Sequence, residues 1–184
     1  MNKKIILAST SPRRKELLQR EGIDFFVDAS FIDETLDVSL SIEDRLCDLA
    51  RRKADPIHRK YPDDIVIGAD TIVYFDNQVI GKATDCQEAR AILERLSDQK
   101  HLVYTGVAIY KGQDLQTFCE KTEVYFKDIK PMIQEYLDSN EWVGKAGAYG
   151  IQGKAGVFID HIVGDLDNVI GLPITKVKEC LLKK

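Results

Sequence analysis

The chain has 184 residues, of which 44% are hydrophobic and 30% are charged, and its formal net charge at pH 7 is -4. This usage is typical of globular proteins and excludes a disordered chain, while the acidic balance argues against a general nucleic-acid binder, which usually carries a basic surface. The length is sufficient for a sizeable core, and we expect a single domain over residues 1–184.

The cysteines argue against a metal or disulfide framework. They are widely spaced, form no CxxC pair and have no histidine nearby in the sequence, which disfavours a zinc site. The apolar run that follows Lys4 ends at Ala8, too early for a signal peptide, and no stretch approaches membrane-spanning length. The sequence therefore predicts a reduced, cytoplasmic protein without a membrane partner.

The first predicted elements are a short strand at 5–8 and a helix that begins after Ser11. Ser11 is a favourable N-cap residue and Pro12 a favourable first helical residue. A capping box would place Glu or Gln where Arg14 stands, and each cation at this end of a helix dipole costs about 0.3 to 1 kcal/mol unless an anion binds there. With Ser9 and Arg13 nearby, the turn fits either a polyphosphate cradle or a solvated helix end with surface arginines.

Strands and helices alternate along the rest of the chain. A short strand at 25–27 and an acidic loop at 33–35 precede a helix from 41 to about 54, which Pro56 is expected to end or kink. An apolar strand at 65–69 follows, and the charge of Asp70 is expected to interrupt it.

The second half is predicted in the same way from periodicity and turn residues. The expected elements are a short strand at 79–80, a helix at 85–96, strands at 101–110 and 117–126 joined by a hairpin loop at 111–114, a helix at 130–140, a glycine-rich stretch at 144–156, a strand at 157–163 and a helix at 173–182. This alternation with a central hairpin predicts an α/β fold with a mixed sheet and flanking helices.

Asp70 is the strongest catalytic candidate, because ligand sites of open α/β sheets lie at strand ends. A carboxylate there can bind a hard cation or act as general base, and the alternative is a structural aspartate that caps a turn or pairs with an arginine. Thr71 is either an ordinary strand residue or one whose hydroxyl reaches a ligand, and either Asp33 or Glu34 can supply a second metal ligand if it is not simply solvated.

Four cations are candidates for binding a triphosphate. Lys53 falls near the apolar face of its helix and Lys82 follows Gly81, so each alone is explained as an amphipathic lysine that covers the core. Together with Arg13 and Arg14 they suit the charge of a triphosphate.

The stretch from Lys145 to Gly153 is rich in small residues that let backbone approach a ligand, and the amide of Gln152 can read a base edge. The alternative is a tight structural loop. A P-loop motif is absent from the sequence, and neither Ser9 nor Ser11 lies in a nucleophile elbow or a recognisable triad, which disfavours covalent catalysis.

Six motifs in order along the chain resemble the Maf-like nucleotide pyrophosphatases. They are Leu7-Ala8-Ser9-Thr10-Ser11-Pro12-Arg13-Arg14, Leu49-Ala50 with Lys53-Ala54, Ile67-Gly68-Ala69-Asp70-Thr71, Gly81-Lys82, Lys145-Ala146-Gly147-Ala148-Tyr149-Gly150-Ile151-Gln152-Gly153 and Gly171-Leu172-Pro173. The resemblance implies a house-cleaning enzyme that cleaves a nucleoside triphosphate between its α and β phosphates, and a mixed α/β fold of the inosine triphosphatase type with two lobes around a deep cleft. A divalent cation, Mg²⁺ or Mn²⁺, and a homodimer are also implied.

The resemblance also assigns roles to individual residues. Asp70 is the proton acceptor and, with Glu34, a metal ligand, while Lys82 acts with the catalytic group. The substrate-binding positions are Ser9, Ser11, Arg13, Arg14, Lys53, Thr71, Lys145 and Gln152. A carboxylate that binds a metal tightly is a poorer base, so Asp70 as a ligand alone remains an alternative.

The Ala-Gly-Ala-Tyr-Gly-Ile-Gln-Gly form of the fifth motif resembles the dTTP/UTP subgroup. This favours dTTP and UTP as substrates, with modified pyrimidine nucleotides as further candidates. The alternatives are another base preference, such as 7-methyl-GTP, and a nucleotide-sensing regulator linked to inhibition of septum formation.

Overall fold

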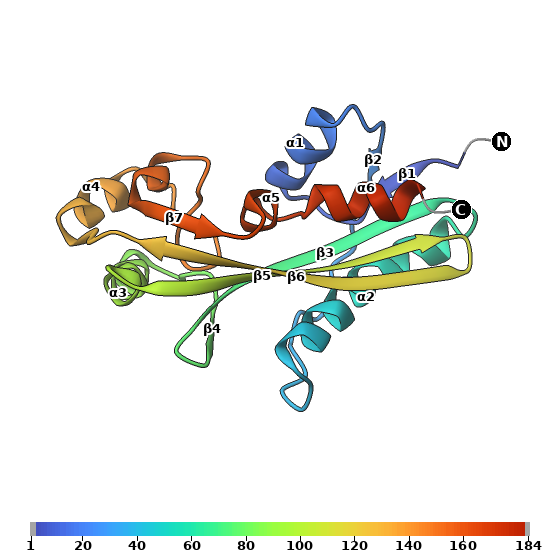
Figure 1. Ribbon diagram of the computed structural model, residues 1–184. Coiled ribbons are helices and arrows are strands. Elements are labelled where there is room, and N and C mark those ends of the chain that lie inside the picture. The colour runs from blue at the N-terminus through green and yellow to red at the C-terminus, as the bar shows by residue number, and fades with distance from the viewer. Residues whose placement is uncertain (1–2, 183–184) are drawn as a thin grey trace. The chain divides into compact units, whose positions relative to one another are not determined.

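A computed structural model describes residues 3–182 and shows a mixed α/β fold (Figure 1). Within these residues seven strands form one sheet in the order β2-β1-β3-β5-β6-β7, and β4 pairs with β3. The strands are β1 (Ile5–Leu7), β2 (Phe26–Val27), β3 (Ile65–Phe75), β4 (Gln78–Ile80), β5 (Lys100–Lys111), β6 (Asp114–Phe126) and β7 (Ile159–Val163). The helices are α1 (Pro12–Arg20), α2 (Ile42–Lys60), α3 (Cys86–Leu96), α4 (Ile133–Asp138), α5 (Leu166–Ile170) and α6 (Ile174–Leu182), with 3-10 turns η1 (Lys130–Met132) and η2 (Lys154–Phe158).

The strand pairings are both parallel and antiparallel, which confirms the predicted mixed sheet. Strand β1 runs parallel to both β2 and β3, with Ile6 opposite Phe26 and Ile5 opposite Ile65. Strand β4 is antiparallel to β3, and β7 is antiparallel to β6. The turn between β3 and β4 has positive φ at both Asp76 and Asn77, as a tight two-residue hairpin turn requires.

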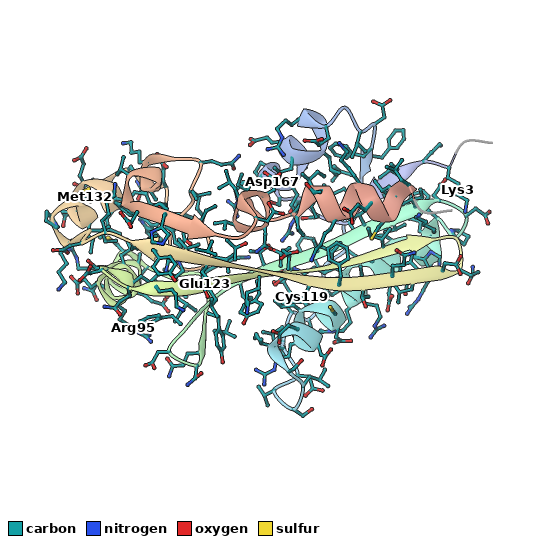
Figure 2. The ribbon with its side chains drawn as sticks, viewed as in Figure 1. Lys3, Arg95, Cys119, Glu123, Met132 and Asp167 are labelled. Atoms are coloured by element: carbon teal, nitrogen blue, oxygen red, sulfur yellow. The ribbon has the colours of Figure 1, made fainter. Side chains whose placement is uncertain are left out.

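The chain divides into two compact units, each with a core of its own. The first takes its described residues from Met1–Thr71, Thr105–Glu120 and Gly171–Lys184, and the second consists of Ile72–Tyr104 and Lys121–Ile170. The first has a core of small and branched residues, among them Ile6, Ala50 and Val66. The core of the second includes aromatic residues such as Phe126 and Phe158, with Met132 packed against it from η1 (Figure 2).

Helix α2 packs backbone to backbone against the sheet of the first unit. A Cβ atom on Gly68 would lie 2.3 Å from the carbonyl oxygen of Ala50, and one on Gly106 would lie 2.4 Å from that of Leu46. Only glycine permits this approach at the two positions, because any side chain would overlap helix backbone. Gly68 therefore sets the distance between α2, which carries Lys53, and strand β3, which carries Asp70, and Gly106 sets the distance between α2 and β5.

Of the two outcomes expected at Pro56, an end or a kink of the helix, the end is wrong, since α2 continues to Lys60. A proline inside a helix removes a backbone donor and costs roughly 3 kcal/mol. Packing beyond Pro56 offsets this cost, because Ile57 is 3% exposed and the ring of His58 stacks on Tyr110 with centroids 4.0 Å apart.

The expectation that Asp70 interrupts its strand is also wrong. Strand β3 continues through Asp70 and Thr71 to Phe75, which places Asp70 in the middle of the strand instead of at its end. A buried strand tolerates polar side chains when they are partnered, and both side chains have partners in the first unit.

Smaller differences lie in the second half. The predicted helix at 130–140 is a 3-10 turn followed by the shorter α4, and the predicted strand at 157–163 begins only at Ile159, after η2. Helix α5 follows β7 where the sequence predicted no element.

The cysteines are Cys47, Cys86, Cys119 and Cys180, and all four are free. None of the helices within residues 3–182 combines the length and the apolar character that crossing a bilayer requires.

Candidate active site

Helix α1 begins without the usual side-chain cap. Ser11 occupies the N-cap position, but its hydroxyl makes no cap hydrogen bond, and the first turn contains no acidic residue. The backbone N–H of Ser11 donates instead to the Oγ of Ser9 at 3.3 Å. This helix start therefore has positive side chains at its positive end and no carboxylate in its first turn to balance them.

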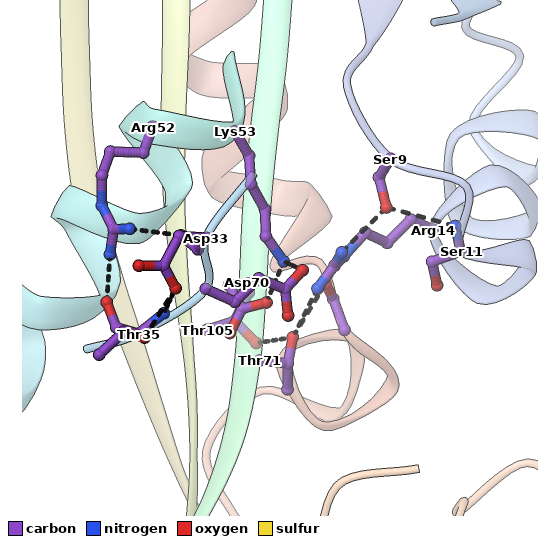
Figure 3. A network of polar contacts seen from close by, with 12 residues as sticks. Ser9, Ser11, Arg14, Asp33, Thr35, Arg52, Lys53, Asp70, Thr71 and Thr105 are labelled. Atoms are coloured by element: carbon purple, nitrogen blue, oxygen red, sulfur yellow. Dashed lines mark hydrogen bonds and ion pairs between the residues drawn. The ribbon is translucent and has the colours of Figure 1, made fainter. Parts of the chain in front are cut away.

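The guanidinium of Arg14 is buried, with the residue 8% exposed, and three neutral oxygens hold it (Figure 3). It donates to Gly171 O at 2.8 Å, to Ser9 Oγ at 3.0 Å and to Thr71 Oγ1 at 3.1 Å. Burial lowers the pKa of Arg14, the negative charge of Asp70 opposes this shift, and the positive charge of Arg13 adds to it. The structure thus places a buried positive charge near Asp70 and bonds it to neutral groups.

Thr71 links Arg14 to strand β5 and to the start of the C-terminal segment. Its Oγ1 lies 2.9 Å from Oγ1 of Thr105 and 3.4 Å from the carbonyl oxygen of Gly171. Thr105 is fully buried. Sequence reasoning gave neither Thr105 nor Gly171 a role at the site, although Gly171 lies within a recognised motif, because their partners are 34 to 157 residues away.

Two carboxylates from distant segments converge on one ammonium group. The Nζ of Lys53 lies 2.5 Å from Oδ1 of Asp70 and 2.8 Å from Oε1 of Glu34. The side chains of Lys53 and Asp70 are 14% and 16% exposed, whereas that of Glu34 is 56% exposed. The arrangement thus places two carboxylate oxygens beside one ammonium group. Glu34 supplies its oxygen from a surface loop, a kind of segment that is usually more mobile than a strand.

The structure separates the two acidic loop residues between which the sequence left the choice open. The carboxylate of Asp33 accepts from the N–H and the hydroxyl of Thr35, at 2.9 and 2.6 Å. Both hydrogen bonds lower the pKa of Asp33, and the bond from the hydroxyl has the larger effect. Asp33 therefore closes its own turn, while Glu34 extends toward Lys53.

Within the second unit, two of the sequence motifs lie side by side. Lys82 forms an isolated antiparallel bridge with Ala146, and the N–H of Gly147 donates to Gly81 O at 3.0 Å. Gly147 has φ +67°, and a Cβ there would lie 2.7 Å from Val73, so this position requires glycine.

The remaining candidate residues are placed as follows. Arg13 is half-buried at the start of α1, and Lys82 and Gln152 are exposed in the second unit. The Nζ of Lys145 donates to the carbonyl oxygen of Glu141. The structure thus brings Ser9, Arg14, Glu34, Lys53, Asp70 and Thr71 together in the first unit. In the second unit Lys82 pairs with Ala146, the residue that follows Lys145.

A divalent cation fits the two carboxylates. Among residues 3–182 no group of three or more His, Cys, Asp or Glu side chains could hold a metal ion. Mg²⁺, however, is commonly bound by only one or two carboxylates together with water and substrate phosphates. Glu34 and Asp70, which already converge on the ammonium of Lys53, provide such a pair.

Comparison with known proteins assigns the chain to a family. The model of a family described as "Maf-like protein" matches residues 4–184. The chain belongs to the Maf family. A Bacillus cereus protein named "dTTP/UTP pyrophosphatase" is 46% identical over 175 residues, which cover 95% of this chain and 86% of the relative. Proteins of the same name from Bacillus anthracis and Bacillus cytotoxicus are 45% identical over 95% of this chain and 92% of their own lengths.

One solved structure similar to this Maf protein is that of the Staphylococcus aureus Ham1 protein. It aligns with a TM-score of 0.46 and 14% sequence identity, over 68% of this chain and 73% of the Ham1 chain.

Proposed function

We propose that this Maf protein is a nucleoside triphosphate pyrophosphatase that hydrolyses dTTP and UTP to the monophosphate and pyrophosphate. The observation that carries the proposal is the convergence of Glu34 and Asp70 on the ammonium of Lys53. Oxygen donors and a cation at one point suit a substrate whose triphosphate brings its own negative charge and a divalent cation. The relatives named dTTP/UTP pyrophosphatase, at 45 to 46% identity, support the same reaction.

In the proposed reaction a water molecule attacks the α-phosphorus and transfers its proton to Asp70. The bond between this phosphorus and the oxygen that bridges to the β-phosphorus breaks, and pyrophosphate leaves with the bonding electrons. Asp70 suits the role of base because its side chain is largely shielded from solvent. Its partner Lys53 can release the carboxylate and bind a phosphate oxygen of the substrate instead, which leaves the carboxylate able to accept a proton.

Glu34 and Asp70 would hold the cation, Mg²⁺ or Mn²⁺. When bound, such an ion neutralises part of the phosphate charge and polarises the phosphoryl oxygens. Asp70 as a ligand alone, without proton transfer, is the alternative form of this proposal.

Positive side chains and the uncapped start of α1 would bind the triphosphate. In the first unit these are Arg13, Arg14 and Lys53, with Ser9, Ser11 and Thr71 as neighbouring donors. Arg14 already uses three of its five N–H donors on protein oxygens, so its proposed phosphate contact uses the remaining ones. The proposed substrate contacts of Lys82, Lys145 and Gln152, like the proposed homodimer, rest on the family resemblance. The proposed cytoplasmic location rests on the spacing of the cysteines and the short apolar run at residues 5–8.

A nucleotide panel tests the proposal. The protein is incubated with dTTP, UTP, the purine triphosphates and 7-methyl-GTP in Mg²⁺ or Mn²⁺, with EDTA as the control, and pyrophosphate is measured. We expect pyrophosphate from dTTP and UTP well above that from the purine nucleotides, and none in EDTA. Equal or reversed rates would remove the pyrimidine preference, and nucleotide binding without turnover would favour a sensing role.

A further inference from the structure

The side chain of Arg52, on α2, donates hydrogen bonds to the loop that carries Glu34. Its Nη1 donates to the carbonyl oxygen of Asp33 at 2.6 Å and its Nη2 to that of Thr35 at 2.7 Å (Figure 3). These are the residues immediately before and after Glu34. A planar guanidinium that binds both flanking carbonyls fixes the backbone of the residue between them.

The guanidinium of Arg52 is itself fixed from its helix. Its Nε donates to Oδ2 of Asp48 at 2.8 Å, and the other oxygen of Asp48 accepts from Arg51 at 2.8 Å. Burial alone would raise the pKa of Asp48, but the hydrogen bonds from Arg51 and Arg52 have the larger combined effect and lower this pKa below its usual value. A charged carboxylate thus orients Arg52 toward the loop.

A second arginine on α2 provides an internal comparison. Arg45 donates to the carbonyl oxygens of Leu40 at 2.8 Å and Val38 at 2.6 Å, further along the same loop. Arg45 and Arg52 are seven residues apart, about two helical turns, and therefore lie on the same side of α2. Both arginines bind loop carbonyls, but only the carbonyls held by Arg52 flank Glu34.

This difference matters because the carboxylate of Glu34 is 56% exposed and comes from a loop, whereas its counterpart Asp70 is held in the middle of a strand. A metal ligand on a loop needs support from outside the coordination sphere, and loss of such support commonly costs about 10- to 100-fold in metal affinity or activity. We propose that Arg52 is the positioning residue that holds Glu34 in place for the divalent cation. The inference rests on the proposed function, because it takes Glu34 to be a metal ligand.

The experiment compares Arg52→Ala and Arg52→Lys with Arg45→Ala, Glu34→Gln and the double variant Arg52→Ala/Glu34→Gln. Lysine retains a charge for Asp48 but cannot bind two carbonyls as a fork. Two quantities are measured on the full chain. One is the Mg²⁺ concentration that gives half-maximal dTTP hydrolysis, and the other is amide hydrogen exchange over residues 33–36 without metal or nucleotide.

We expect Arg52→Ala to raise the half-saturating Mg²⁺ concentration about tenfold or more, with a smaller rise for Arg52→Lys. Exchange of the Thr35 amide, which donates to Asp33, should become faster in both. Arg45→Ala should leave the Mg²⁺ requirement within about twofold, since it releases a different part of the loop. In the double variant Arg52→Ala should add little to the effect of Glu34→Gln, because both changes remove the same ligand.

Three outcomes would overturn the inference. If Glu34→Gln raises the Mg²⁺ requirement but neither Arg52 variant does, the proposed function stands and the positioning role fails. The same holds if the effects of Arg52→Ala and Glu34→Gln multiply in the double variant. If Glu34→Gln leaves the Mg²⁺ requirement unchanged, Glu34 is not a ligand, and the metal assignment fails together with the role of Arg52.

Discussion

Helices α1 and α2 both begin after a serine, yet only one of them follows the local rules of helix capping. The hydroxyl of Ser41 accepts the backbone N–H of Asp44 at 3.1 Å, and the first turn of α2 also carries Glu43. At α1 the hydroxyl of Ser11 makes no such bond, and arginines occupy the positions where α2 has acids. A helix start with its own cap and acidic first turn stabilises the fold, whereas one with no side-chain cap and two arginines in its first turn is suited to bind an anion.

Carboxylates also divide into one that caps a helix and one that faces a cation in the candidate site. Changing the second kind should have the largest effect on activity. Asp85 caps α3 by accepting the N–H of Glu88 at 2.8 Å, while Asp70 faces Lys53 and caps no helix. Asp70→Asn should lower kcat for dTTP hydrolysis about 10²- to 10⁴-fold, because asparagine can accept no proton from water at neutral pH. The matched change Asp85→Asn should leave kcat unchanged, since asparagine is an equally good cap. Undiminished activity of Asp70→Asn would remove both of its proposed roles.

His101 is a buried polar residue that belongs to the core of the second unit and not to the candidate site. It is 1% exposed, its Nε2 lies 2.7 Å from the hydroxyl of Tyr149, and burial lowers its pKa from 6.5 to about 3. The unfolded chain then binds a proton that the folded chain does not between about pH 6.5 and 3, so stability should fall as pH falls through this window. From pH 7.5 to 5 the loss should be about 2 kcal/mol.

Urea unfolding at several pH values measures this dependence. The double variant His101→Phe/Tyr149→Phe removes the titrating group and its partner together, and it should flatten the slope between pH 6.5 and 5. His161→Gln is the control, because the His161 side chain is 52% exposed and should leave the slope intact. An unchanged slope in the double variant would show that another group causes the acid sensitivity.

A smaller effect compares the two ends of α1. Arg13 lies at the start, where a phosphate is proposed to bind, and Arg20 lies in the last turn, where a cation suits the dipole. Arg13→Ala should raise KM for dTTP at least about tenfold, since a hydrogen bond to a charged group contributes roughly 1.5 kcal/mol or more. Arg20→Ala should leave KM unchanged. Steady-state kinetics on both variants test the pair, and an equal KM in both would contradict the phosphate contact of Arg13.

The smallest effect addresses the two serines directly. Ser41→Ala should lower the free energy of unfolding by about 1 kcal/mol, the usual value of a side-chain cap. Ser11→Ala should lower it by less than about 0.5 kcal/mol, because it removes no cap bond. Urea denaturation measures both, and equal losses would mean that Ser11 caps α1 after all.

Features that depend on neighbours in sequence were predictable. The β1-turn-α1 segment was evident from an apolar run followed by Ser11 and Pro12, and α3 from Asp85 followed by helical periodicity. The hairpin turn between β5 and β6 was predicted for the same reason. These elements are determined by local backbone preferences.

Features that depend on distant partners were not predictable. Strand β3 continues through Asp70 because Lys53, 17 residues away, pairs with the carboxylate, and α2 passes Pro56 because its last turn packs against the sheet. That Glu34 pairs with Lys53 while Asp33 binds Thr35 depends on the turn geometry of this loop. Thr105 and Gly171 entered the site only through hydrogen bonds with partners far along the chain.

The products formed from dTTP in ¹⁸O-labelled water with Mg²⁺ show directly which phosphorus the water attacks. We expect dTMP and pyrophosphate in equal amounts, with the label in dTMP, because water attacks the α-phosphorus. Formation of dTDP and orthophosphate, or label in the pyrophosphate, would contradict it.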